Sequence, residues 1–376
     1  MYQRTIEKHI KDDLFQGKII VLYGPRQVGK TTLSKKILEE YGAEGQYFDC
    51  QALAVHDFLV PNPQIMKARF GDARVVVLDE AQYVPDFGRV LKVFHDAYPG
   101  TQLLVTGSSA FDLANKANES LAGRVREYCL FPLSVEEIIA TDGRVSFDAR
   151  EETFFRFGMY PGIVQLDQER MRRDLETLQS AVLYKDILAL EGVQKPRLLM
   201  NLLKALALQV GAEVSNSSLA NLLDTSVQTV DRYVDILEKM FIIKRLYALS
   251  RNPRVEIRKG YKVYFIDLGI RNSIIQNHNP MNIRNDAGAL FENFCIIERL
   301  KHISNHCWGA NMYFWRTQEG REIDYIEERE GTLFSYECTL AGKSILSASK
   351  RFKELYPGAP DTELITRENV VSLVMP

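Results

Sequence analysis

The stretch Gly24-Pro25-Arg26-Gln27-Val28-Gly29-Lys30-Thr31 has the form G-x-x-x-x-G-K-T, and its surroundings decide the fold. The apolar run before it, residues 18–23, is typical of a buried strand, and residues 32–40 after it have the periodicity of a helix. A glycine-rich loop between a strand and a helix directs backbone N–H groups at phosphate oxygens, and the helix N-terminus adds positive potential. The stretch therefore predicts a phosphate-binding loop at the start of an α/β domain.

Two residues of this loop are expected to do more than shape it. Lys30 would reach the β- and γ-phosphates of a nucleotide, and the hydroxyl of Thr31 would hold magnesium. The residues predicted to contact the nucleotide are Gly24, Pro25, Arg26, Gln27, Val28, Gly29, Lys30, Thr31, Thr32 and Ser108.

A second apolar run, residues 75–78, ends in Asp79 and Glu80. Four consecutive apolar residues favour a central parallel strand that is buried on both faces. The carboxyl ends of such strands meet at the ligand-binding edge of the sheet, so the two acids are expected beside the glycine loop. Asp79 would hold the magnesium ion, and Glu80 would polarise the attacking water.

A third predicted strand, residues 102–105, leads into Thr106-Gly107-Ser108-Ser109. Thr106 and Ser108 are candidates for sensing the γ-phosphate, but the same residues suit an ordinary turn, and the two interpretations have equal weight. Arg124 follows, and an arginine at this point could neutralise charge on the γ-phosphate of its own or a neighbouring subunit. A solvated surface arginine is the alternative.

These motifs together carry a resemblance to a known family. In their order and spacing, the segments GPRQVGKTTL, VVVLDEAQ, LLVTGSS and SLAGRVREYCLFPLS resemble the bacterial and archaeal AAA-type ATPases of unknown function. That resemblance covers nearly the whole chain. It implies a P-loop core, a winged helix and a C-terminal domain of the restriction-endonuclease type, with Glu80 as the catalytic glutamate and Arg124 as the arginine finger.

Composition limits the other classes of function. The chain has 376 residues, of which 46% are hydrophobic and 26% charged, so several globular domains are expected. A net charge of −2 gives no overall attraction to nucleic acid, so any such binding must come from a local patch. The five cysteines are scattered and no apolar run could span a membrane, which favours a cytoplasmic protein.

The middle of the chain is predicted to be mainly helical. Residues 131–197 would form a helical lid, in which Ser134 and Glu137 have the spacing of a capping box. Three helical segments follow, over 198–210, 217–223 and from Ser226 onward, and then two β-rich stretches at 241–247 and 261–266. This order predicts a winged helix-turn-helix.

The sequence leaves the partner of this winged helix open. On the exposed face of its third helix Gln228, Thr229 and Arg232 suit DNA, whereas Asp231 and Asp235 would repel phosphate. A basic cluster in the wing favours phosphate contact, and consists of Arg251, Arg254, Arg258, Lys259 and Lys262. A winged helix that contacts protein is an equally weighted alternative.

A new pattern begins at about residue 286. It consists of a helical segment at 289–300 and β-rich runs at 312–315, 323–326 and 333–338. The family resemblance identifies Glu292, Asp324 and Glu337 as the metal-binding acids of a nuclease-like domain. The position of the usual lysine, two residues after the last acid, is occupied by Thr339, although Lys343 lies nearby in the sequence. Threonine cannot provide the missing cation, so nuclease activity is not expected.

The sequence therefore predicts an α/β protein: a P-loop NTPase of the AAA type with a parallel sheet (1–130), a helical lid (131–197), a winged helix-turn-helix (198–285) and an α/β restriction-endonuclease-like domain (286–376). The predicted function is magnesium-dependent ATP hydrolysis coupled to a nucleic acid or another partner, with ATP and Mg²⁺ as cofactors. A nucleotide-gated switch with little turnover is the alternative, and an active nuclease is a third possibility. DNA and further copies of the chain are the partners considered.

Overall fold

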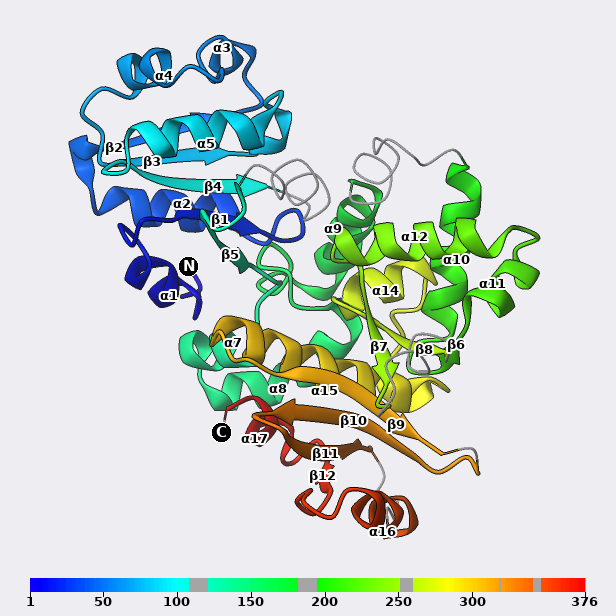
Figure 1. Ribbon diagram of the computed structural model, residues 1–376. Helices are drawn as coiled ribbons and strands as arrows, with labels where there is room; N and C mark the ends of the chain where they lie inside the picture. Colours follow the sequence, from blue (N-terminus) through cyan, green and yellow to red (C-terminus); the bar gives the residue numbers. More distant parts are fainter. Residues whose placement is uncertain (108–120, 182–194, 251–259, 318, 341–345, 376) are drawn as a thin grey trace. The chain divides into compact units, whose positions relative to one another are not determined.

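The computed structural model describes residues 1–107, 121–181, 195–250, 260–317, 319–340 and 346–375. The chain divides into two compact units (Figure 1). The first consists of residues 1–132 with the short segments 239–241 and 304–306, and the second contains the remaining residues. Each unit has its own β-sheet.

The first unit is built on a parallel sheet of five strands in the order β2-β3-β4-β1-β5. Its strands are β1 (Ile19–Tyr23), β2 (Gly45–Asp49), β3 (Val75–Asp79), β4 (Gln102–Gly107) and β5 (Val125–Cys129). Strands β3 and β4 are buried along their whole length, as their apolar sequences predict. Strand β4 pairs with both β1 and β3. The glycine loop after β1 and Asp79 at the end of β3 are therefore one strand apart.

Helix α1 (Glu7–Asp12) of this unit precedes β1, and the unit's other described helices lie between the parallel strands in the sequence. They are α2 (Lys30–Glu39), α3 (Leu53–His56), α4 (Pro63–Phe70) and α5 (Phe87–Ala97), with 3-10 turns η1 (Gly42–Glu44) and η2 (Ala81–Tyr83). The aromatic rings of Phe48, Phe58, Phe70 and Phe94 contact one another at centroid distances of 4.9–6.1 Å. This cluster fixes β2 and the two neighbouring helices α4 and α5, and truncating a buried phenylalanine of this kind costs about 3–5 kcal/mol.

The second unit begins with helices and also contains the second sheet. Its helices are α7 (Val135–Asp142), α8 (Arg144–Phe157), α9 (Gln168–Ser180), α10 (Pro196–Leu208), α11 (Asn216–Leu222), α12 (Val227–Lys239), α14 (Leu268–Ile274), α15 (Ala287–Asn305), α16 (Leu346–Leu355) and α17 (Val370–Val374), with the 3-10 turn η4 (Met281–Ile283). The capping box predicted for Ser134 and Glu137 is confirmed at the start of α7. Ser226 accepts a hydrogen bond from the backbone N–H of Thr229 at the start of α12.

The sheet of the second unit has seven strands in the order β12-β11-β10-β9-β7-β8-β6. They are β6 (Glu213–Val214), β7 (Ile243–Ala248), β8 (Tyr261–Phe265), β9 (Asn311–Arg316), β10 (Glu322–Arg329), β11 (Thr332–Cys338) and β12 (Glu363–Ile365). The hairpin β7–β8 is antiparallel, and β7 also pairs in parallel with β9. The strands of the predicted winged helix and of the predicted nuclease-like domain therefore belong to one continuous sheet.

Candidate functional site

The glycine loop lies between β1 and α2, and two of its glycines are required by the backbone. Gly24 has φ +147°, and a Cβ atom there would lie 2.1 Å from the carbonyl oxygen of Leu130. Gly29 has φ +99° and precedes the first residue of α2, where it offers no side chain to cap the helix. The first N–H groups of α2 are therefore left without a side-chain cap, and such groups are available to an anion.

Lys30 is folded back onto the loop. Its Nζ atom donates hydrogen bonds to the carbonyl oxygens of Gly24 at 2.9 Å and Pro25 at 2.7 Å, and the residue is only 5% exposed. Burial lowers the pKa of Lys30 to about 8, although the nearby carboxylates of Glu80 and Asp79 oppose that shift. A phosphate group would offer this buried ammonium an anionic partner in place of two neutral carbonyls.

Asp79 at the end of β3 is surrounded by hydroxyl groups. Its Oδ2 atom accepts hydrogen bonds from Thr31 Oγ1 at 2.7 Å and from Tyr47 Oη at 2.6 Å, while Oδ1 accepts one from Thr106. Magnesium prefers oxygen ligands from carboxylates, hydroxyls and water. The convergence of the Thr31 hydroxyl with a carboxylate that is 4% exposed therefore fits such an ion.

Tyr47 was missed by the sequence analysis. It lies on the edge strand β2, whose mixed polar sequence gives no motif, and it reaches Asp79 because β2 pairs in parallel with β3. A parallel partner for β3 could be expected from the fold, but the tyrosine itself carried no signal.

Glu80 follows β3 in an unusual backbone conformation. It has φ +53° and ψ +46°, a left-handed region that a residue with a side chain enters at a cost of about 1 kcal/mol or more. Its N–H donates to Thr106 Oγ1 at 3.1 Å, and its Oε2 atom accepts a hydrogen bond from Gln82 Nε2 at 2.5 Å. Thr106 thus contacts both acids, whereas Ser108, the other candidate sensor, lies outside the described residues.

Arg124 lies at the amino end of the parallel strands, whereas the glycine loop lies at their carboxyl end. It precedes β5, and its carbonyl oxygen accepts a hydrogen bond from the N–H of Ile19 at the start of β1, whereas the glycine loop follows the end of β1. The four residues between these points span about 13 Å, more than an arginine side chain reaches. Arg124 also forms a two-point ion pair with Asp96, at 2.8 and 3.2 Å. This placement does not support a role for Arg124 at the nucleotide site of its own subunit.

Arg4 is a second residue that the sequence analysis missed. Its guanidinium donates to the carbonyl oxygens of Val28, inside the glycine loop, at 2.7 Å and of Phe131 at 2.6 Å. The side chain connects the N-terminal segment, the loop and the residues after β5. These partners lie 24 and 127 residues away in the chain, so no local pattern could indicate them.

In the segment predicted to form a helix-turn-helix, the two acids expected to repel DNA have partners. Asp235 pairs with Arg245 of β7 at 2.5 Å, and Asp231 accepts a hydrogen bond from Asn216 at 2.8 Å. The wing residues Arg251, Arg254, Arg258 and Lys259 lie outside the described residues. Lys262 is only 2% exposed, so its assignment to a phosphate-binding basic cluster is wrong. The winged-helix interpretation itself stays a prediction.

The three acids of the predicted nuclease-like site occupy α15 (Glu292), β10 (Asp324) and the adjacent β11 (Glu337). Burial raises the pKa of Glu292 and of Glu337 to about 7 each. Their oxygens do not all come within 4.8 Å of one another, and Lys262 Nζ lies 2.9 Å from Glu292. Thr339 is 7% exposed. This arrangement does not fit the divalent metal of a nuclease.

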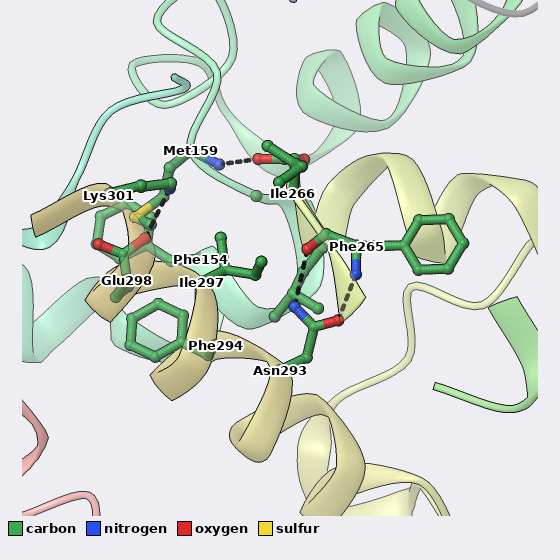
Figure 2. A pocket seen from close by; sticks show the side chains of 12 residues that line it. Phe154, Met159, Phe265, Ile266, Asn293, Phe294, Ile297, Glu298 and Lys301 are labelled. Atoms are coloured by element: carbon green, nitrogen blue, oxygen red, sulfur yellow. Dashed lines mark hydrogen bonds and ion pairs between the residues drawn. The ribbon is translucent and has the colours of Figure 1, made fainter. Parts of the chain in front are cut away.

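A small pocket in the second unit is part of its core. Figure 2 shows Asn293 bonded through both side-chain atoms to the backbone of Phe265, and Lys301 beside Glu298. Lys301 donates to Glu298 at 2.6 Å and to the carbonyl oxygen of Leu133 at 2.9 Å. Because these polar groups bond to the protein itself, we interpret the pocket as structural.

Three family models match successive parts of the chain. Residues 16–139 match the model of an AAA domain, residues 150–280 a domain of unknown function (DUF8612), and residues 287–373 another domain of unknown function (DUF4143). The match of residues 16–139 to the AAA model agrees with the glycine loop and the parallel sheet of the first unit. Within the described residues, none of the helices has the length and apolar character needed to cross a bilayer.

Whole-chain comparisons add relatives but no activity. Uncharacterised proteins of Mycobacterium bovis and Mycobacterium tuberculosis are each 28% identical over 354 residues, covering 93% of this chain and 76% of theirs. Among solved structures, the RuvB Holliday junction branch migration motor of Thermotoga maritima is similar at 18% identity and a TM-score of 0.34, over 64% of this chain and 88% of that chain. A TM-score of this size does not establish a shared fold.

Proposed function

We propose that this protein is a magnesium-dependent ATPase whose reaction takes place at the carboxyl end of β1 and β3. The observation that carries the proposal is the 2.7 Å contact between Thr31 Oγ1 and Asp79 Oδ2, beside a glycine loop that holds a buried lysine. A hydroxyl and a carboxylate joined in this way offer two oxygen ligands to one cation next to the phosphate-binding amides.

Each residue would have a distinct role. The N–H groups of the loop and of the first turn of α2 bind the phosphates, and Lys30 moves from the Gly24 and Pro25 carbonyls to the β- and γ-phosphates. Thr31 and Asp79 would hold magnesium, which would neutralise charge on the phosphate oxygens. Glu80 orients the attacking water and accepts its proton. Thr106 keeps Glu80 and Asp79 in register, since it bonds to both.

The proposal is tested by measuring binding and turnover separately. Binding of a fluorescent ATP analogue and steady-state release of phosphate are measured with magnesium and with EDTA. We expect binding in the micromolar range and turnover that EDTA abolishes. A folded protein that binds no purine nucleotide in the presence of magnesium would rule the proposal out.

A nucleotide-gated switch is the second candidate, and the contact between Glu80 and Gln82 favours it. The 2.5 Å hydrogen bond from Gln82 restrains the Glu80 carboxylate, so turnover would be slow if a partner has to break that contact before Glu80 can orient water. Phosphate release with and without duplex DNA separates the two candidates. Tight ATP binding with negligible turnover under both conditions supports the switch, whereas stimulation by DNA supports a coupled ATPase.

We propose that Arg124 acts on the nucleotide of a neighbouring subunit, because it lies away from the glycine loop of its own subunit and pairs with Asp96. We expect Arg124→Ala to lower turnover on the order of 1000-fold. A mixture of Arg124→Ala and Lys30→Ala proteins, each inactive alone, should recover activity, since the Lys30→Ala subunit still supplies its arginine. Arg74→Ala is the control, because Arg74 is an exposed arginine that also pairs with an exposed acid, Glu44. Wild-type turnover of Arg124→Ala would contradict the role.

Tyr47→Phe tests whether the tyrosine hydroxyl positions Asp79. We expect the magnesium concentration for half-maximal turnover to rise about tenfold, because one of the hydroxyl donors that orient the carboxylate is lost. Nucleotide binding in EDTA should not change. Tyr98→Phe, at the end of α5 and among the core aromatics, is the matched control. An unchanged magnesium dependence in Tyr47→Phe would show that the hydroxyl is dispensable.

A further inference from the structure

The carboxylates of the nuclease-like site surround a lysine that comes from another part of the sequence. Lys262 lies on β8, in the helix-turn-helix segment, and its side chain is 3% exposed. Its Nζ atom is 2.9 Å from Glu292 Oε1, 2.5 Å from Glu322 Oε1 and 3.6 Å from Asp324 Oδ1. One ammonium thus contacts three acids, on helix α15 and strand β10.

Protein donors also take up further oxygens of the same acids. Glu292 Oε1 accepts a hydrogen bond from the hydroxyl of Tyr264 at 2.6 Å, and Asp324 Oδ2 accepts one from the backbone N–H of Cys338 at 3.0 Å. Oxygens that would be ligands of a metal are therefore bonded to N–H and O–H groups. A divalent ion would have to displace a buried ammonium, which would then lose its compensating charges.

We propose that Lys262 is a built-in counter-ion of the nuclease-like acids, which takes the place of the divalent metal and excludes it. The same contacts attach strand β8 to helix α15 and strand β10, so the helix-turn-helix segment and the C-terminal segment share a charged core. Phosphodiester cleavage of the nuclease type needs a metal between the acids and the scissile phosphate, and the ammonium prevents that metal from binding. The proposal is independent of the ATPase function.

The test is binding of Mn²⁺ alone, followed by electron paramagnetic resonance, in an Asp79→Asn background that removes the proposed magnesium ligand of the other unit. With Lys262 present we expect no stoichiometric binding up to millimolar Mn²⁺. Lys262→Met removes the charge and keeps an apolar stem, so affinity should rise roughly 100-fold or more. Lys262→Arg keeps the charge and should behave like Lys262. Adding Asp324→Asn to Lys262→Met should abolish the new site.

Two results would overturn the proposal. One is tight Mn²⁺ binding by the protein with Lys262 intact that Asp324→Asn removes. The other is Mn²⁺-dependent nicking of plasmid DNA that Lys262→Met abolishes, since Lys262 would then be catalytic. Both use folded protein with Lys262 in place as the reference. The melting temperature of that protein should also be the same in Mn²⁺ and in EDTA, so the proposal stays testable if Lys262→Met does not fold.

Discussion

Lys30→Ala is expected to cause a large loss of nucleotide affinity. The ammonium of Lys30 is buried, and the proposed phosphate contacts are charge-assisted hydrogen bonds in a site with little access to water. Losing one partner of such a buried charge pair costs about 2–5 kcal/mol, which weakens binding roughly 30-fold to several thousand-fold. The loss should be measured by titrating a fluorescent ATP analogue.

The same variant should remain folded. Burial lowers the pKa of Lys30, so the charged side chain is held at a cost that alanine removes. The matched control is Lys35→Ala, because Lys35 lies on the same helix, is exposed and contacts the ring of Tyr47 instead of the loop. We expect the control to bind like the wild type. Wild-type affinity in Lys30→Ala, with an unchanged melting temperature, would contradict a phosphate-binding role for the loop.

The central strands of the first unit could be predicted from the sequence, whereas its edge strands could not. The strands predicted at 18–23, 75–78 and 102–105 correspond to β1, β3 and β4, which are covered on both faces. Strands β2 and β5 are mixed in sequence and partly exposed, because they lie at the two edges of the sheet. An edge strand needs no continuous apolar run, so periodicity alone misses it.

In the second unit the helix starts could be predicted from the sequence, but the pairing of distant strands could not. The helices α7 and α12 begin at the capping serines Ser134 and Ser226, which are local signals. The pairing of Tyr247 with Tyr313 in strands β7 and β9 joins segments on either side of the predicted boundary at residue 285. No turn motif or residue spacing in the sequence indicates that these residues pair, so the continuous sheet could not be predicted.

The proposed nucleotide site shows the same division. The motif indicated Lys30, Thr31 and Asp79, because the chemistry of phosphate and magnesium requires those residue types at those places. It could not locate Tyr47, whose contact with Asp79 depends on the strand order. The sequence also could not show at which end of the parallel strands Arg124 lies. Distance along the chain does not tell whether a residue lies beside the start or the finish of a neighbouring strand.

Glu80→Gln is expected to keep nucleotide binding and lose hydrolysis. Glutamine has the same shape, and its amide oxygen can still accept the hydrogen bond from Gln82. The backbone N–H of residue 80 would still donate to Thr106, so the backbone conformation with φ +53° should not change. The amide cannot accept a proton from water, and losing a general base lowers turnover about 10²–10⁴-fold. ATP affinity should stay within about threefold of wild type, because Glu80 is assigned no phosphate contact.

Phosphate release at saturating ATP and binding of the fluorescent analogue give the two numbers. Glu44→Gln is the matched control, because Glu44 is an exposed acid that precedes β2 and pairs with Arg74 at the far end of that strand from Asp49. Turnover of Glu80→Gln at the wild-type rate would remove Glu80 from the mechanism. Loss of binding together with turnover would instead make Glu80 a structural residue, because a group that acts only on the attacking water contributes nothing to the affinity for ATP.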